Sequence, residues 1–167
     1  GSIMLGDAST GTINAANYNT GVGIDIFAAL TSGDANVAFG WSALKAVTSA
    51  SNNVAVGYKS MEDLTTGEQN VALGNSTLMQ LTTASNNTAV GQSGLNANTT
   101  GTGNVAVGHQ VMDANTTGDA NTAVGKDALG ANTTGNNNTA VGKDAMLLNT
   151  TGAANAAFGY LALDANT

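Results

Sequence analysis

Residues 121–137 read Asn-Thr-Ala-Val-Gly-Lys-Asp-Ala-Leu-Gly-Ala-Asn-Thr-Thr-Gly-Asn-Asn, and residues 138–154 repeat this pattern with five changes. We number each coil from position 1 to position 17, beginning at this Asn. Extended backwards, the same frame reaches Gly23 and Gly6, which makes about ten coils. A fixed period of this length is typical of a solenoid, in which each repeat packs on its neighbours. The glycine at position 5 recurs without insertion or deletion at Gly40, Gly57, Gly74, Gly91, Gly108, Gly125, Gly142 and Gly159.

The repeat divides the chain into two parts. Residues 1–35 hold degenerate coils, in which Thr10 stands where later coils have Leu, whereas residues 36–167 hold the regular coils. Terminal coils of a solenoid are atypical because they cap the stack. The last coil stops after position 13, so we expect one continuous solenoid domain that is a fragment of a longer fibre.

Positions 1–4 have the period of two that is typical of a short strand, with positions 2 and 4 on one face. Position 4 is always apolar, so we expect this face to pack into the core. Position 3 lies on the other face, and an unvarying small residue there indicates the close approach of another backbone. Position 3 is alanine in all eight regular coils (Ala38, Ala55, Ala72, Ala89, Ala106, Ala123, Ala140 and Ala157).

Positions 6–12 place apolar residues at positions 8, 9 and 12, which is a helical spacing. The pattern predicts a short helical or irregular arm after the glycine turn, followed by a Thr-Thr-Gly bend at positions 13–15. Position 9 is Leu or Met in every regular coil. Position 12 is Val47, Leu64 and Leu81 at first and then Asn98, Asn115, Asn132, Asn149 and Asn166.

Identical strands at a fixed spacing predict a mainly β fold, a parallel β-solenoid with a rise of about 4.8 Å per coil. Asn at position 1 and Thr at position 13 should form ladders along it. Each coil offers only two or three large apolar side chains, and the chain has no Cys for disulfides. A weak core without disulfides or metal favours oligomerisation. We therefore expect an intertwined or packed homotrimer, with the alanine column lining its axis.

Composition excludes several classes of function. The 167 residues include four cations, all Lys, and carry a net charge of −7. Nucleic-acid binding needs clustered Lys and Arg, so no nucleic-acid partner is expected. No apolar run approaches the roughly 18 residues of a membrane span. No His, Asp or Cys cluster has metal-ligand spacing, and we expect neither a metal nor a cofactor.

The repeated Asn-Val-Ala-Val-Gly and Asn-Thr-Ala-Val-Gly segments resemble the Ser-Val-Ala-Ile-Gly-type repeats of trimeric autotransporter adhesin (YadA-like) heads. The fuller unit, which ends in Asn-Thr-Thr-Gly, is similar to repeats of phage-tail-fibre-like proteins. The resemblance covers residues 19–167 and implies a homotrimeric fibre segment or tip that attaches to a surface, outside the cell or on a virion. Adhesin heads use a shorter coil than the 17 residues found here.

The catalytic inventory is small, and we expect no enzyme. His109 is the only histidine, and no supporting motif makes it part of a catalytic triad. The best carboxylate candidates are Glu62-Asp63 and the pair Asp127 and Asp144. Glycosidases need two carboxylates facing each other across a cleft, which a regular rod does not offer. Lys126-Asp127 and Lys143-Asp144 are expected to form diagonal ion pairs between coils.

Position 6 holds the residues best placed for a ligand surface, namely Trp41, Tyr58, His109 and Tyr160. Trp41 and Tyr58 occupy adjacent coils and should stack about 5 Å apart. We expect such a pair either to bind the sugar rings of a surface glycan or to pack against a neighbouring chain or the end cap. The Asn-Thr-Thr sequons at Asn98, Asn115, Asn132 and Asn149 follow from the repeat and are weak evidence for glycosylation.

Three functions remain open. The first is the attachment fibre, with a glycan or another surface receptor as partner. The second is a solenoid that binds ice or a carbohydrate surface through threonine ladders. Adjacent threonines such as Thr133 and Thr134 should point to opposite faces if extended, which would present only one ladder. The third is a fibre-borne glycosidase.

Overall fold

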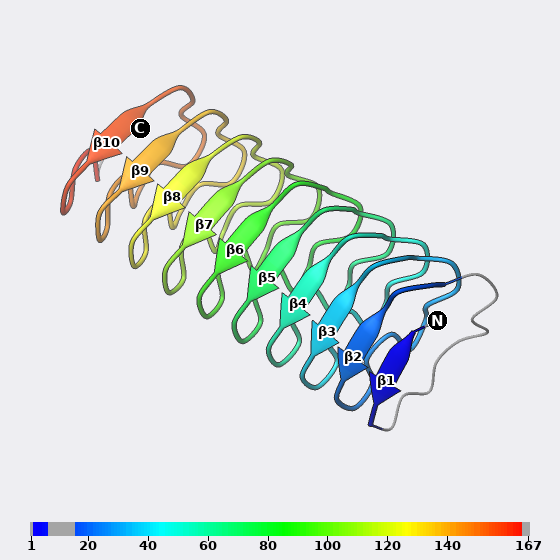
Figure 1. Ribbon diagram of the computed structural model, residues 1–167. Coiled ribbons are helices and arrows are strands. Elements are labelled where there is room, and N and C mark those ends of the chain that lie inside the picture. Colours follow the sequence, from blue (N-terminus) through cyan, green and yellow to red (C-terminus); the bar gives the residue numbers. More distant parts are fainter. Residues whose placement is uncertain (1, 7–15, 165–167) are drawn as a thin grey trace.

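Each coil contributes one strand of three residues, and the strands stack into a single parallel sheet (Figure 1). The structure, a computed structural model, describes residues 2–6 and 16–164. Every strand pairs with the strand before and after it in the sequence, in a register that joins identical positions, such as Val37 with Val54. The parallel β-solenoid is thereby confirmed. The strands are β1 (Ile3–Leu5), β2 (Thr20–Val22), β3 (Val37–Phe39), β4 (Val54–Val56), β5 (Val71–Leu73), β6 (Thr88–Val90), β7 (Val105–Val107), β8 (Thr122–Val124), β9 (Thr139–Val141) and β10 (Ala156–Phe158).

The strands present the opposite face to the core from the one expected. The alanines of position 3 are buried, whereas position 4 points outward, with Val56 38 % exposed and Phe39 39 % exposed. The coil is too narrow for a larger residue at position 3, because the side chains of positions 8 and 9 fill the same level. Coil 2 shows this compensation. Its position 3 is Gly21, and a Cβ there would collide with the side chains of Ile26 and Phe27.

The alanine column therefore cannot line an axis between chains, and that expectation is wrong. Each coil instead closes its own core with side chains from positions 3, 8, 9 and 12. Leu44, Leu78 and Met112 are fully buried without any second chain. Position 9 is fully buried from Phe27 to Met146, as expected, whereas Leu163 in the last coil is 47 % exposed. Asn166 and Thr10 lie outside the described residues.

The arm of positions 6–11 is a series of turns, and the helical alternative is wrong: the described residues contain no helix. Most of its backbone N–H groups bond to a neighbouring coil, and bonds within the arm, such as that from the Ala128 N–H to the Gly125 carbonyl at 3.4 Å, span three residues without continuing as a helix. Leu44 N–H donates to the Ser60 carbonyl at 3.1 Å, and Ala46 N–H donates to the Glu62 carbonyl at 3.0 Å. The inter-coil bonds satisfy the groups that a helix would have paired internally, so a helix offers no advantage.

The path of the backbone around each coil requires the left-handed backbone conformation at positions 7, 9 and 17 of nearly every coil. Leu95 has φ 50°, Ser93 has φ 56° and Asn86 has φ 63°. Non-glycine residues adopt this region at a cost, which is greatest for β-branched side chains. None of the three positions carries Val, Ile or Thr in any described coil.

Leu95→Ile is expected to lower the free energy of unfolding by about 1–3 kcal/mol, because isoleucine is β-branched and Leu95 has φ 50°. Leu95→Met is the matched control, because Met112 occupies the same position with φ 48°. The methionine variant should stay within about 1.5 kcal/mol of the parent. Urea unfolding of both variants measures the difference, and equal stabilities would disprove the backbone explanation.

Side-chain ladders run along the solenoid, as the sequence predicted, with the asparagines of position 1 buried and the threonines of position 13 at the surface. The Asn104 backbone N–H donates to Asn87 Oδ1 at 3.0 Å, and Asn104 Nδ2 donates to the Gly118 carbonyl at 2.8 Å. At position 13, Thr99 Oγ1 donates to the Thr116 carbonyl at 3.1 Å. The asparagine bonds satisfy buried polar groups, and both ladders hold neighbouring coils in register.

A second asparagine ladder begins where position 12 changes from apolar to polar. Asn115 Nδ2 donates to Asn98 Oδ1 at 3.0 Å and to the Gly118 carbonyl at 3.1 Å. In earlier coils the same position holds the buried Leu64 and Leu81. The same backbone conformation thus accommodates either an apolar side chain or a hydrogen-bonded asparagine at position 12.

Candidate functional site

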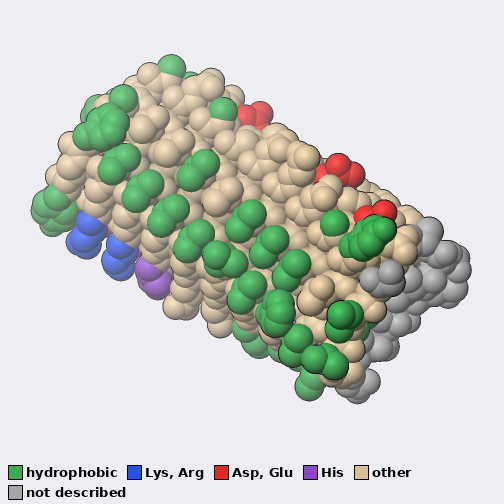
Figure 2. Space-filling view, viewed as in Figure 1, with side chains coloured by type: hydrophobic (Ala, Val, Ile, Leu, Met, Phe, Trp, Pro, Cys, Tyr) green, Lys and Arg blue, Asp and Glu red, His purple; other side chains and the backbone are tan. Residues whose placement is uncertain are grey.

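The largest uniform surface of the molecule is the outward side of the sheet, made by positions 2 and 4 of β2–β10 and called the sheet face below. Positions 2–4 of these coils contain no charged residue. At position 4, Val107 is 38 % exposed and Leu73 is 37 % exposed. Figure 2 shows the resulting rows of hydrophobic side chains along the length of the rod. A continuous apolar surface of this length is unusual on a protein that works alone.

The two edges of the sheet face carry opposite charge in places. Position 6, which follows the strand, holds Lys126 and Lys143, and position 16, which precedes it, holds Asp34, Glu68 and Asp119. In Figure 2 the basic side chains and the histidine lie along one edge, and acidic side chains lie along the opposite edge. Each edge can attract the other edge of a second copy only weakly, because Lys126 and Lys143 already pair with Asp127 and Asp144 of their own coils.

Trp41 and Tyr58 stack as expected, with ring centroids 5.0 Å apart and planes inclined by 31°. Lys59 Nζ lies 5.5 Å from the Trp41 ring and 5.9 Å from the Tyr58 ring, and it pairs with Glu62 at 3.0 Å. This hydrogen bond to Glu62 raises the pKa of Lys59. A sugar stacks on the open face of a ring, whereas these rings turn one face each toward the other. Trp41 and Tyr58 thus form an aromatic pair at position 6, at the edge of the sheet face.

The other candidate ligand residues do not join this aromatic pair. His109 lies exposed between Gln92 and Lys126 in the column of position 6, four coils beyond Trp41. Tyr160 lies near the C-terminal end, with Lys143 Nζ 5.1 Å from its ring. The four residues share one edge of the rod without converging on one site.

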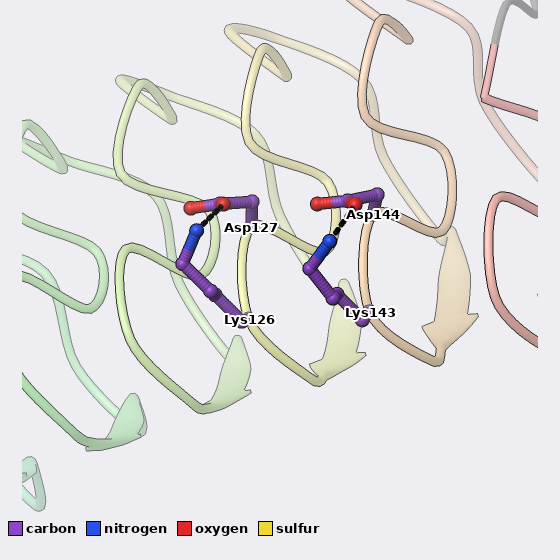
Figure 3. A network of polar contacts seen from close by, with 4 residues as sticks. All are labelled: Lys126, Asp127, Lys143 and Asp144. Carbon is purple, nitrogen blue, oxygen red and sulfur yellow. Dashed lines mark hydrogen bonds and ion pairs between the residues drawn. The ribbon is translucent and has the colours of Figure 1, made fainter.

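The lysine–aspartate pairs form within one coil and not diagonally between coils, so that expectation is wrong. Lys126 Nζ lies 2.7 Å from Asp127 Oδ2, and Lys143 Nζ lies 2.7 Å from Asp144 Oδ2 (Figure 3). Position 7 is in the left-handed region, with φ 56° at Asp127, and the carboxylate there lies beside the preceding lysine. Such exposed pairs contribute at most about 1 kcal/mol. The hydrogen bond with Asp144 raises the pKa of Lys143.

The carboxylates do not assemble into a reactive pair. Glu62 is engaged by Lys59, while burial raises the pKa of the neighbouring Asp63 carboxyl. Burial also raises the pKa of Asp113 on another coil. Over residues 2–6 and 16–164, no three acidic, histidine or cysteine side chains come close enough to hold a metal ion.

The sequon asparagines are structural. Asn98, Asn115, Asn132 and Asn149 are fully buried, with their side chains in the second asparagine ladder. A glycosyltransferase needs an accessible amide nitrogen, so the folded coils do not offer these sites.

Position 16 has a role that sequence reasoning missed. Asp119 Oδ1 accepts the Thr102 N–H at 2.7 Å, and Asn136 Oδ1 accepts the Asp119 N–H at 2.6 Å. The side chain of each coil thus caps the backbone of the coil before it. The signal was present in the composition of the column, which is rich in Asp, Ser, Thr and Asn, the residues that bond locally to backbone.

No protein-family model, curated protein or solved structure matches this chain. Its likeness to adhesin heads and tail-fibre repeats is therefore a resemblance of motifs. Nowhere in the described part of the chain is there a helix with the length and apolar character of a membrane span.

Proposed function

We propose that this chain is a non-enzymatic segment of a homotrimeric fibre that projects from a cell or virion and attaches to a surface. The observation that carries the proposal is the uncovered sheet face, whose apolar side chains run over nine consecutive strands. Removing such side chains from water is the main driving force of association. The likeness to trimeric adhesin heads favours three copies.

A parallel trimer also suits the charges at the two edges. In a ring of three chains, one edge of each sheet face meets the other edge of its neighbour. Asp119 and Lys126 flank the same strand, β8, so a parallel arrangement sets the lysine of one chain beside the aspartate of the next. The rigid, laddered rod then serves as a spacer, and a surface glycan or another receptor is its partner.

The experiment is a measurement of mass in solution by sedimentation equilibrium, with Val107→Lys and Val124→Lys combined in one variant. We expect the parent to have the mass of three chains. The variant should associate at least a hundredfold more weakly, because two ammonium groups per chain would be buried in an apolar interface. Raising the salt concentration should strengthen association of the parent, because it screens the repulsion between chains of net charge −7.

Gln80→Lys is the control, because it adds the same charge at an exposed position outside the sheet face. It should leave the mass unchanged. A parent that stays monomeric at every concentration would rule out the trimer.

A further inference from the structure

A second repetitive surface lies on the return segment of the coil, away from the strand. Positions 13 and 14 are both threonine in six consecutive coils. We call these side chains the threonine array: Thr65, Thr66, Thr82, Thr83, Thr99, Thr100, Thr116, Thr117, Thr133, Thr134, Thr150 and Thr151.

The two threonines of a coil do not lie in an extended segment, so the expectation of opposite faces does not apply. They form a bend, in which position 14 is exposed and position 13 is exposed or half-buried in every coil of the array. The threonine array therefore presents two parallel columns of side chains and not one.

The column of position 13 is held rigidly. The Thr116 carbonyl accepts the Thr99 N–H at 3.0 Å and the Thr99 hydroxyl at 3.1 Å, and the Thr100 N–H approaches it at 3.3 Å. This pattern repeats from coil to coil, since Thr116 bonds Thr133 in the same way. Because its hydroxyl donates to the next coil, each side chain of position 13 from Thr65 to Thr133 has a fixed rotamer.

The column of position 14 keeps its hydroxyls for solvent. No bond joins the hydroxyl of Thr100, Thr117 or Thr134 to any described residue. Successive hydroxyls stand one coil apart, about 4.8 Å. In the C-terminal coils position 11 holds Ala97, Ala114 and Ala131 and position 15 holds glycine, and Asp119 at position 16 is the nearest charged residue that follows the array in these coils.

We propose that the threonine array binds the surface of ice. A rigid row of hydroxyls and methyls at a spacing near that of water molecules along the ice lattice holds first-layer water in lattice-like positions. Because β-branched side chains have few rotamers, little entropy is lost on binding. The low density of charge beside the C-terminal half of the array matters because ions bind water in a geometry that ice does not accept.

The experiment measures thermal hysteresis and the shape of ice crystals in solutions of the parent and of Thr100→Tyr combined with Thr117→Tyr. The parent should depress freezing below melting and facet the crystals. The bulky rings should abolish most of this activity, because they lift the protein off a flat lattice. Gln92→Tyr is the control and should keep full activity, since the same position already holds Tyr58 and Tyr160.

Circular dichroism establishes that all three proteins are folded. An inactive parent, or an active double variant, would overturn the proposal. Sedimentation of the protein with powdered cellulose or chitin, without any effect on freezing, would also overturn it in favour of a carbohydrate surface. The result is independent of the trimer, because the mass in solution is measured separately and the threonine array is not part of the sheet face.

Discussion

Gly108→Ala is expected to lower the free energy of unfolding by about 3–5 kcal/mol, from overpacking and backbone strain together. A Cβ at Gly108 would lie 2.5 Å from the Gly125 carbonyl oxygen and 2.7 Å from its carbon. Both atoms belong to the backbone of the next coil and cannot rotate away. In addition, Gly108 has φ 146°, a conformation that L-residues rarely adopt.

Two controls separate these causes. Gly159 has φ 123°, but an added Cβ meets nothing within 4 Å among the described residues, so Gly159→Ala should cost only the strain, about 1–3 kcal/mol. Gly103 has φ 70° and equally free space, at a position where Ala120 has φ 54°. Gly103→Ala should therefore be tolerated within about 1 kcal/mol. If urea unfolding shows the same loss of stability for all three variants, the close contact between glycines of neighbouring coils does not explain why position 5 is always glycine.

Asn104→Ala is expected to cost about 3–5 kcal/mol, because each buried group left unpaired costs about 1–3 kcal/mol. Asn104 Oδ1 accepts the Asn121 N–H at 2.9 Å and Asn121 Nδ2 at 3.2 Å. Both donors are fully buried and would lose this acceptor. Asn155, at the half-buried end of the described ladder, is the control, since water can replace its bonds.

Asn104→Asp tests the same ladder through pH. The new carboxylate keeps the acceptor for Asn121 but faces the Gly118 carbonyl, to which Asn104 Nδ2 now donates. Burial against oxygen atoms raises the pKa of the aspartate above its value in the unfolded chain. The folded state then binds the proton more tightly, so stability is lost as pH rises through the folded pKa and is recovered in acid. A variant with equal stability at pH 4 and pH 8 would contradict the ladder geometry.

The repeat frame, the parallel sheet and the ladders of Asn and Thr were all predictable from the sequence. They depend only on translation by one coil, which places identical residues above one another whatever path the coil follows. The position of each column within the coil was harder to predict. Positions 3 and 4 alternate as a strand must, but alternation alone does not say which face is inside.

The size of the side chain decides which face is inside, because only alanine or glycine fits there in the coils of β2–β10. Hydrophobicity alone would predict the opposite face. Val124 is more hydrophobic than Ala123, yet Ala123 is fully buried with Ala128 and Leu129 of the same coil, while Val124 is 37 % exposed. Only the path of the arm reveals this, and the spacing of the arm suggested a helix. The wrong expectation that the alanines line an axis between chains followed from placing position 4 in the core.

One feature of the sequence does indicate the path of the arm. Val and Thr are common in the chain, yet positions 7, 9 and 17 never carry a β-branched residue in the described coils. Gly103 stands at position 17, where the other described coils have Ala, Asn, Gln or Tyr. Such a depletion is typical of left-handed backbone, which excludes a helix across positions 7–9.

The strict 17-residue period also bears on how such a molecule changes over generations. Loss of a single residue would set every later Asn, Thr and Gly against the wrong partner, and selection should remove it. Duplication or loss of one whole coil, by contrast, keeps every contact and alters the length by about 4.8 Å. The reach of the rod can therefore evolve in equal steps, by unequal recombination between tandem copies, without any new interaction having to arise.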